Sequence, residues 1–91
     1  MIRIGVLVSG SGSNLQSIMD ACAAGEIDGT VVMVISNVEG VYALERAERG
    51  GIPSRVISHA DYPDREAFDA ELAKALLECR VDLVCLAGFM R

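Results

Sequence analysis

The sequence predicts an α/β fold, an open parallel sheet of four strands with three helices distributed over both faces. Short apolar runs alternate along the chain with segments of helical periodicity, the order expected for parallel strands joined by right-handed crossovers. The connections between these segments are short. Hydrophobic residues make up 52% of the 91 residues and aromatic residues only 4%. Aliphatic side chains in this proportion suit strands that are buried on both faces.

The first strand is expected at residues 2–8, and a helical pattern begins at Leu15. Its apolar residues recur at i, i+3, i+4 and i+7, the spacing of one helix face: Leu15, Ile18, Met19 and Cys22. Gly25 and Gly29 are expected to close this helix and its loop. The apolar run at the N-terminus lacks a cleavage site of small residues, so it is interpreted as a strand and not as a signal peptide.

The middle of the chain predicts a second strand at residues 30–35 and a short helix at residues 41–49. Gly50 and Gly51 end that helix. A third strand then follows at residues 54–57.

The third helix has the clearest pattern. One face is apolar and carries Phe68, Leu72, Leu76 and Cys79. The other face is expected to point to water and carries Glu66, Asp69, Lys74 and Glu78. Asp61 or Asp64 is expected to cap the N-terminus of this helix. The fourth strand is expected at residues 81–86.

The loop after the first strand predicts an anion site. Residues 9–14 read Ser-Gly-Ser-Gly-Ser-Asn. Glycine lets the backbone approach a ligand closely, and the first amides of a helix lack intrahelical acceptors. A phosphate is the natural occupant, although the motif is neither the dinucleotide fingerprint nor a P-loop. The alternative is a tight turn in which Ser13 or Asn14 only caps the helix.

Polar or glycine-containing segments follow three of the predicted strands, namely residues 9–14, residues 36–37 and residues 87–91. In an open parallel sheet, ligands bind beyond the carboxyl ends of the strands. We therefore expect these segments to meet at one edge of the sheet.

Charge and cysteine content narrow the class of partner. The net charge of −5 disfavours nucleic acid or an anionic membrane surface as the main partner. Cys22, Cys79 and Cys85 are widely spaced in apolar patterns, which favours reduced packing residues in a cytoplasmic protein. The single histidine, His59, is interpreted as a loop residue, and no metal site is expected.

The fourth strand has an open apolar edge, because the chain ends directly after it. Natural domains avoid such an edge. We therefore interpret the chain as a fragment of a longer protein, the alternative being a complete four-stranded domain.

Four segments together carry a resemblance to a known family. They are Ser-Gly-Ser-Gly-Ser-Asn-Leu-Gln at residues 9–16, Ser-Asn at 36–37, Asp-Arg-Glu-Ala-Phe-Asp at 64–69 and Leu-Ala-Gly-Phe-Met-Arg at 86–91. In this order and spacing they resemble phosphoribosylglycinamide formyltransferase. The likeness covers the whole chain but only about the first half of the family's domain. It implies a Rossmann-like formyltransferase fold in which residues 1–91 form the N-terminal nucleotide-binding half and the C-terminal catalytic half is absent.

The resemblance implies transfer of a formyl group from 10-formyltetrahydrofolate to glycinamide ribonucleotide in purine synthesis, without a metal. The residues implied to bind the ribonucleotide phosphate are Gly12, Ser13 and Asn14. Those implied to contact the folate are Arg65, Leu86, Phe89, Met90 and Arg91. The family's catalytic Asn-x-His segment and later aspartate have no counterpart among the 91 residues, so the isolated chain is expected to be inactive.

The implied partners are small-molecule substrates, in a monomer or homodimer, with neither nucleic acid nor a membrane. Three alternatives stay open: a related formyltetrahydrofolate hydrolase, a methionyl-tRNA formyltransferase and a stand-alone phosphate- or nucleotide-binding α/β module. The hydrolase is disfavoured because its extra domain usually precedes the first strand, and the tRNA enzyme because its first loop differs. For Arg65 the alternative is a surface charge paired with Asp69 at i+4.

Overall fold

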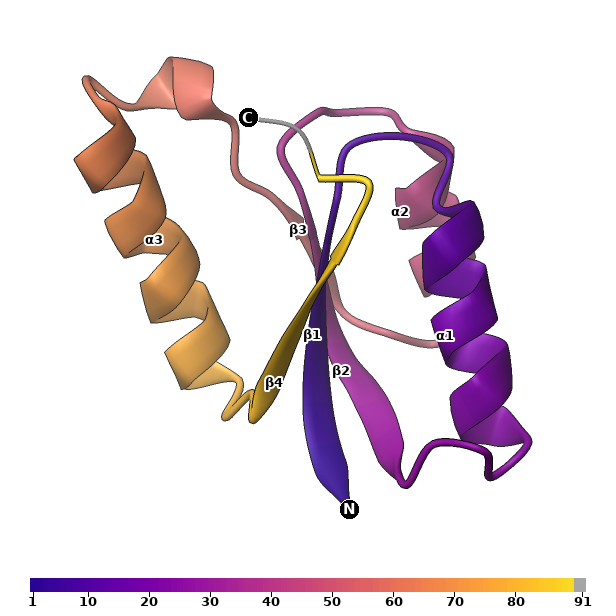
Figure 1. The fold of residues 1–91 in the computed structure, drawn as a ribbon. Helices are drawn as coiled ribbons and strands as arrows, with labels where there is room; N and C mark the ends of the chain where they lie inside the picture. The colour runs from indigo at the N-terminus through magenta and orange to yellow at the C-terminus, as the bar shows by residue number, and fades with distance from the viewer. Residues whose placement is uncertain (90–91) are drawn as a thin grey trace.

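The computed structural model of the chain describes residues 1–89. Strands and helices alternate along it, as predicted (Figure 1). The elements are β1 (Ile2–Val8), α1 (Ser13–Ala23), β2 (Gly29–Ser36), α2 (Tyr42–Arg49), β3 (Ser54–Val56), the short 3-10 helix η1 (His59–Asp61), α3 (Arg65–Glu78) and β4 (Leu83–Ala87).

All four strands are parallel, in the spatial order β3-β2-β1-β4. The last residue of β1, Val8, pairs with Ser36 of β2 on one side and with Ala87 of β4 on the other. The carboxyl ends of these three strands are therefore level, and the loops that follow them begin at one edge of the sheet.

The helices lie on both faces of the sheet (Figure 1), which confirms the predicted fold class. Successive side chains of a strand point to opposite faces, and β1 follows this rule. Val6 and Val8 pack with Leu15 of α1 and with α2, whereas Leu7 packs with Phe68 of α3. Two apolar layers thus hold the sheet, one on each side.

Helix α1 begins two residues earlier than the apolar pattern indicated, at Ser13, and its N-cap is Gly12. No side chain caps this helix, so the alternative of a capping role for Ser13 or Asn14 is wrong. At α3 the predicted side-chain cap is present, because the Asp64 carboxylate accepts a hydrogen bond from the Ala67 amide at 2.8 Å.

Strand β4 starts later than predicted, at Leu83 instead of residue 81. The Val81 amide is still used to close α3, donating to the Leu76 carbonyl at 3.1 Å. The next amide, that of Asp82, then donates to the Arg3 carbonyl at 2.7 Å and starts the register with β1. Asp69 also differs from its prediction, since it is half-buried and does not simply face water.

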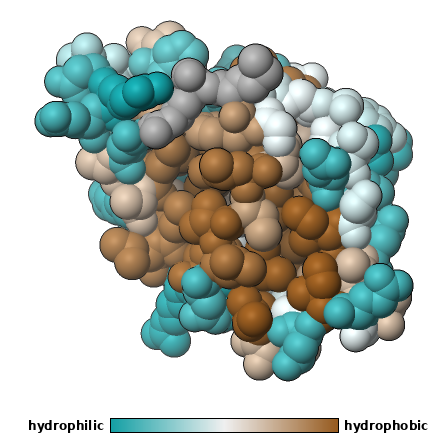
Figure 2. Space-filling view, viewed as in Figure 1, coloured by the Kyte–Doolittle hydropathy of each residue, from teal (hydrophilic) through white to brown (hydrophobic). Residues whose placement is uncertain are grey.

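Strand β4 lies at an edge of the sheet, and much of its side-chain surface is exposed. Figure 2 shows a broad apolar area on the face of the molecule that carries β4. The exposed apolar side chains of this strand are Leu83, Val84 and Leu86. Within residues 1–89, no helix is long and apolar enough to cross a membrane.

Candidate functional site

A cavity of about 220 Å³ lies at the carboxyl edge of the sheet, between the loop that follows β1 and the end of β4. It is lined by residues 10–14 on one side and by Ala87 and Gly88 on the other. Beside it, the Ser9 hydroxyl donates to the Asn37 side-chain oxygen at 2.6 Å. The predicted convergence of the three strand ends is therefore confirmed for the residues that the structure describes.

Gly12 is required at its position for two separate reasons. Its φ is +79°, a conformation that residues with a Cβ adopt only at a cost. A Cβ added there would also lie 2.7 Å from the Ala43 Cβ and 2.8 Å from the Ala43 Cα. The loop is thus pressed against the start of α2, where the Ala43 amide donates to the Gly10 carbonyl at 3.2 Å.

The potential at this loop favours an anion. Helix α1 points its N-terminus at the cavity with neither a side-chain cap nor an acidic residue in its first turn. Its first amides and the positive end of its macrodipole are therefore available to a ligand. Ser13 and Asn14 line the cavity and are exposed, so their side chains add hydrogen-bond donors.

Arg46 of α2 brings a positive charge to the same loop. Its Nε donates to the Ser11 carbonyl at 2.8 Å, and its Nη1 donates to the Gln16 side-chain oxygen at 3.3 Å. Sequence reasoning missed this residue, because Arg46 belongs to no motif. The two helices α1 and α2 bring it to the loop only by packing side by side on one face of the sheet.

The wall formed by β4 is more open. Ala87 is buried, and Gly88 turns the chain with a φ of +74°. Leu86 is 69% exposed and pairs with Leu7 in the register, so it faces the same side of the sheet as α3. Phe89 is half-buried against the apolar cluster between the sheet and α3.

Among the other predicted folate contacts, Arg65 is the first residue of α3 and is exposed. Met90 and Arg91 lie outside the described residues. The cavity at the β1 loop is not lined by Arg65, Leu86 or Phe89. The structure thus brings together the predicted phosphate residues. Of the predicted folate residues, it places Leu86 and Phe89 at the neighbouring end of β4, whereas Arg65 begins α3.

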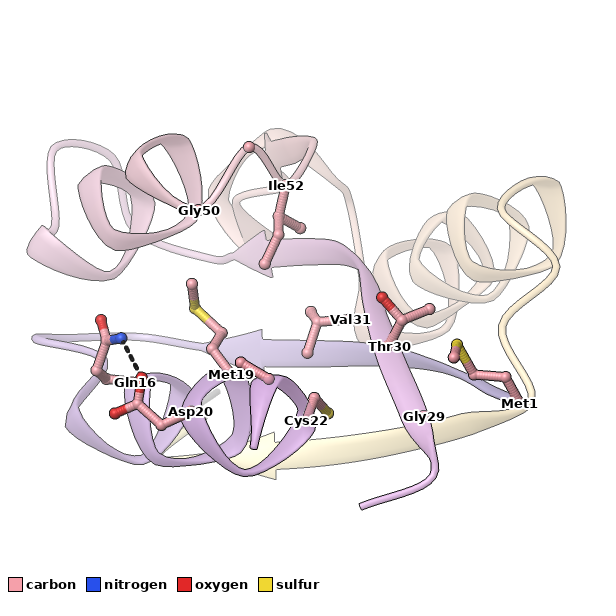
Figure 3. Close-up of a pocket in the computed structure, with 12 residues that line it drawn as sticks. Met1, Gln16, Met19, Asp20, Cys22, Gly29, Thr30, Val31, Gly50 and Ile52 are labelled. Atoms are coloured by element: carbon pink, nitrogen blue, oxygen red, sulfur yellow. Dashed lines mark hydrogen bonds between the residues drawn. The ribbon is translucent and has the colours of Figure 1, made fainter. Parts of the chain in front are cut away.

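Two larger cavities, each of about 530 Å³, were not predicted. One opens between α1, the start of β2 and the turn after α2, with Met19, Cys22 and Ile52 among its lining (Figure 3). The other is at the carboxyl edge, beside β2 and η1, and His59 lines it. His59 was expected in a loop, but it starts η1 and packs edge-on against Phe68 at 6.1 Å between ring centroids.

Comparison with known proteins gives one consistent family. A family model described as formyl transferase matches residues 2–91. The chain is 57% identical over 91 residues to the trifunctional purine biosynthetic protein adenosine-3 of Drosophila melanogaster, covering 98% of this chain and 7% of that protein. It is 46% identical over 90 residues to the phosphoribosylglycinamide formyltransferase of Escherichia coli, covering 99% of this chain and 42% of that enzyme.

The fold agrees with solved structures of the same class. The crystal structure of glycinamide ribonucleotide transformylase 1 from Symbiobacterium toebii superposes with a TM-score of 0.97 and is 57% identical, covering 100% of this chain and 43% of that one. The corresponding protein from Geobacillus kaustophilus has a TM-score of 0.95 at 38% identity, with 100% and 48% covered. The chain therefore spans less than half the length of these relatives.

Proposed function

This chain belongs to the formyl transferase family, and we propose that residues 1–91 form the N-terminal nucleotide-binding part of a phosphoribosylglycinamide formyltransferase domain. In this proposal the whole protein transfers a formyl group from 10-formyltetrahydrofolate to glycinamide ribonucleotide. The identity to the enzyme of Escherichia coli, 46% over 90 residues, supports the reaction. The longer relatives support a catalytic part outside these residues, so the 91-residue chain alone is expected to be inactive.

The observation that carries the proposal is the cavity lined by residues 10–14. We propose that Gly12, Ser13 and Asn14 bind the phosphate of the ribonucleotide. Backbone amides at a helix N-terminus suit this ligand, because they donate hydrogen bonds along the positive end of the helix dipole. Gly12 lets the backbone come close, and the exposed Ser13 and Asn14 side chains supply further donors.

The folate is proposed to bind at the β4 side of the same edge. Leu86 and Phe89 offer apolar surface there, as the pterin ring of the folate requires. Arg65 offers a charged donor for the carboxylates of the folate. Met90 and Arg91 complete the proposed contacts. The role of these residues is to hold the formyl donor close to the ribonucleotide amine. The amine attacks the formyl carbon, the bond from that carbon to the folate nitrogen breaks, and tetrahydrofolate leaves.

The proposed location is the cytoplasm. Cys22, Cys79 and Cys85 are free and half-buried, as expected for thiols that serve packing in a reducing compartment. The proposed partners are the two small-molecule substrates, and the oligomeric state stays a prediction of monomer or homodimer.

The phosphate assignment is tested by Asn14→Asp in the complete protein, with affinity for glycinamide ribonucleotide measured by isothermal titration calorimetry. The new carboxylate stands beside the phosphate, so we expect affinity to fall about 10- to 100-fold through like-charge repulsion. An acidic residue in the first turn stabilises a helix, so the variant is expected to fold.

The matched control is Ser54→Asp, which adds the same charge at an exposed position at the start of β3. It is expected to leave the affinity within about twofold, because solvent screens a distant charge. Equal affinity of wild type and Asn14→Asp would overturn the phosphate assignment. Binding of inorganic phosphate as tight as that of the ribonucleotide would instead favour a general phosphate-binding module.

A further inference from the structure

We propose that Arg46 is a positioning residue, which holds the Ser11–Gly12 peptide group in the orientation that anion binding at the β1 loop needs. The inference rests on the proposed function, since it concerns the same site. It adds a residue from α2 to a site that is otherwise built from the strand ends and α1.

The contact is directed at the backbone of the loop and not at the cavity. The Arg46 Nε donates to the Ser11 carbonyl at 2.8 Å, a short hydrogen bond from a charged donor. Its side-chain Cδ lies 3.2 Å from the point where a Cβ of Gly12 would be. The half-buried Arg46 thus covers the Ser11–Gly12 peptide on the side of α2.

Because a peptide group is planar, the contact with the Ser11 carbonyl also sets the direction of the Gly12 N–H. The chain has no cis peptide bond among its described residues, and in a trans peptide the N–H points opposite to the carbonyl. With the Ser11 carbonyl held toward α2, the Gly12 N–H is directed away from α2. The same contact keeps the partial negative charge of that carbonyl turned away from an anion in the cavity.

Glycine makes such a restraint necessary. Gly12, at φ +79°, has no Cβ to oppose rotation of the peptide that precedes it. Without a partner for its carbonyl, the Ser11–Gly12 peptide can turn and present oxygen, instead of N–H, to the ligand. Gly12 lets the loop approach a phosphate, but it also leaves the Ser11–Gly12 peptide free to rotate. Arg46 restrains that rotation.

Arg46 is itself held in place by two further contacts. Its Nη1 donates to the Gln16 side-chain oxygen at 3.3 Å, and its guanidinium lies 4.6 Å from the centroid of the Tyr42 ring. A planar guanidinium can donate in two directions and stack on a ring at the same time, which a lysine ammonium cannot do. The role therefore depends on the shape of arginine as well as on its charge.

Arg49 provides a matched control within the same helix. It also lies over Tyr42, at 5.5 Å from the ring centroid, and it pairs with Glu45 at 2.8 Å. Its described hydrogen bonds go to Glu45 and Tyr42, both within α2. Loss of Arg49 removes one positive charge and one ring contact from α2 but leaves the Ser11 carbonyl engaged.

The experiment compares Arg46→Ala, Arg46→Lys and Arg49→Ala in the complete protein, by steady-state kinetics with both substrates. We expect Arg46→Ala to raise the KM for glycinamide ribonucleotide about tenfold or more, with the folate KM within about twofold. Arg46→Lys is expected to recover only part of this loss, whereas Arg49→Ala stays near wild type. Full recovery by lysine, or an equal loss in Arg49→Ala, would overturn the positioning role.

A second measurement, on the free protein, does not depend on the substrate. The ¹H–¹⁵N resonance of Gly12 is expected to be single and sharp in wild type and Arg49→Ala, and shifted or exchange-broadened in Arg46→Ala. An unchanged Gly12 resonance in Arg46→Ala would refute the restraint even if the ribonucleotide binds. A changed resonance in a protein that does not bind the ribonucleotide would uphold the restraint and count against the proposed function instead.

Discussion

The two walls of the carboxyl-edge cavity are built differently. The wall formed by residues 10–14 is backed by α2, where Ala43 and Arg46 contact the loop backbone directly. The wall formed by Ala87 and Gly88 continues an edge strand, and the neighbouring Leu86 is 69% exposed. One wall is fixed by contacts from a second helix, and the other has an open flank within the described residues.

This difference indicates how the two substrates of the proposed reaction depend on residues 1–91. A phosphate requires donors held in position, and the loop backbone of the proposed phosphate site is held by the Arg46–Ser11 and Ala43–Gly10 hydrogen bonds. A pterin requires an enclosed apolar surface, and in the proposed function the β4 wall is one side of it. We therefore expect these residues to contribute more to ribonucleotide affinity than to folate affinity.

The sharpest test of the comparison substitutes the positive-φ glycine in each wall. Gly12→Ala is expected to destabilise by roughly 2–5 kcal/mol, from backbone strain and from the overlap with Ala43. Gly88→Ala has a similar φ but nothing within 4 Å of the added Cβ, so about 1 kcal/mol is expected from strain alone. Urea unfolding followed by circular dichroism measures both. Equal losses would show that the loop wall is no more tightly packed than the other.

Phe89→Ala tests whether the β4 wall is anchored at all. Phe89 is half-buried against the cluster that contains Phe68 and Leu72. We expect a loss of about 1.5–2.5 kcal/mol, roughly half of what a fully buried phenylalanine loses. The same urea titration measures it, with Phe89→Leu as the conservative control. A loss below the error of the titration would mean that this wall lacks an apolar anchor.

Ser9→Ala tests the connection between the loop wall and the end of β2. The substitution removes the 2.6 Å hydrogen bond to Asn37, a residue that is only 3% exposed. We expect a loss of about 1 kcal/mol, the usual net value of one partly buried hydrogen bond. Ser17→Ala, whose exposed hydroxyl donates to a carbonyl of its own helix at 3.2 Å, is the control. A thermal unfolding midpoint that drops equally in both variants would contradict a special role for the Ser9 contact.

Leu86→Ser is expected to have the smallest effect on stability, within about 0.5 kcal/mol, because the side chain is already largely in water. If Leu86 contacts the folate, the same variant raises the folate KM and leaves the ribonucleotide KM unchanged. Steady-state kinetics of the complete protein separates the two values. A higher ribonucleotide KM with an unchanged folate KM would contradict the assignment of Leu86 to the folate.

The segments with hydrophobic periodicity and the residues that end or cap them were predictable from the sequence, and the long-range contacts were not. The strand at residues 2–8, a side-chain cap of α3 by Asp61 or Asp64, and the meeting of strand ends follow from local pattern and from the rules of parallel sheets; the structure selects Asp64 as the cap. The start of α1 was misplaced because a glycine cap leaves no side-chain signal. The start of β4 was misplaced because the closing turn of α3 uses the Val81 amide.

The sequence by itself determined the α/β class, the strand–glycine–helix unit that can hold an anion, and the residues that line it. These are local properties, because they follow from hydrophobic periodicity and from the backbone freedom of glycine. Only the tertiary structure decided that α2 lies against the loop, so that Ala43 requires glycine at position 12 and Arg46 holds the Ser11 carbonyl. The physical reason is separation along the chain: Arg46 and Ser11 are far apart in sequence, and only the packing of α1 and α2 on one face of the sheet brings them into contact.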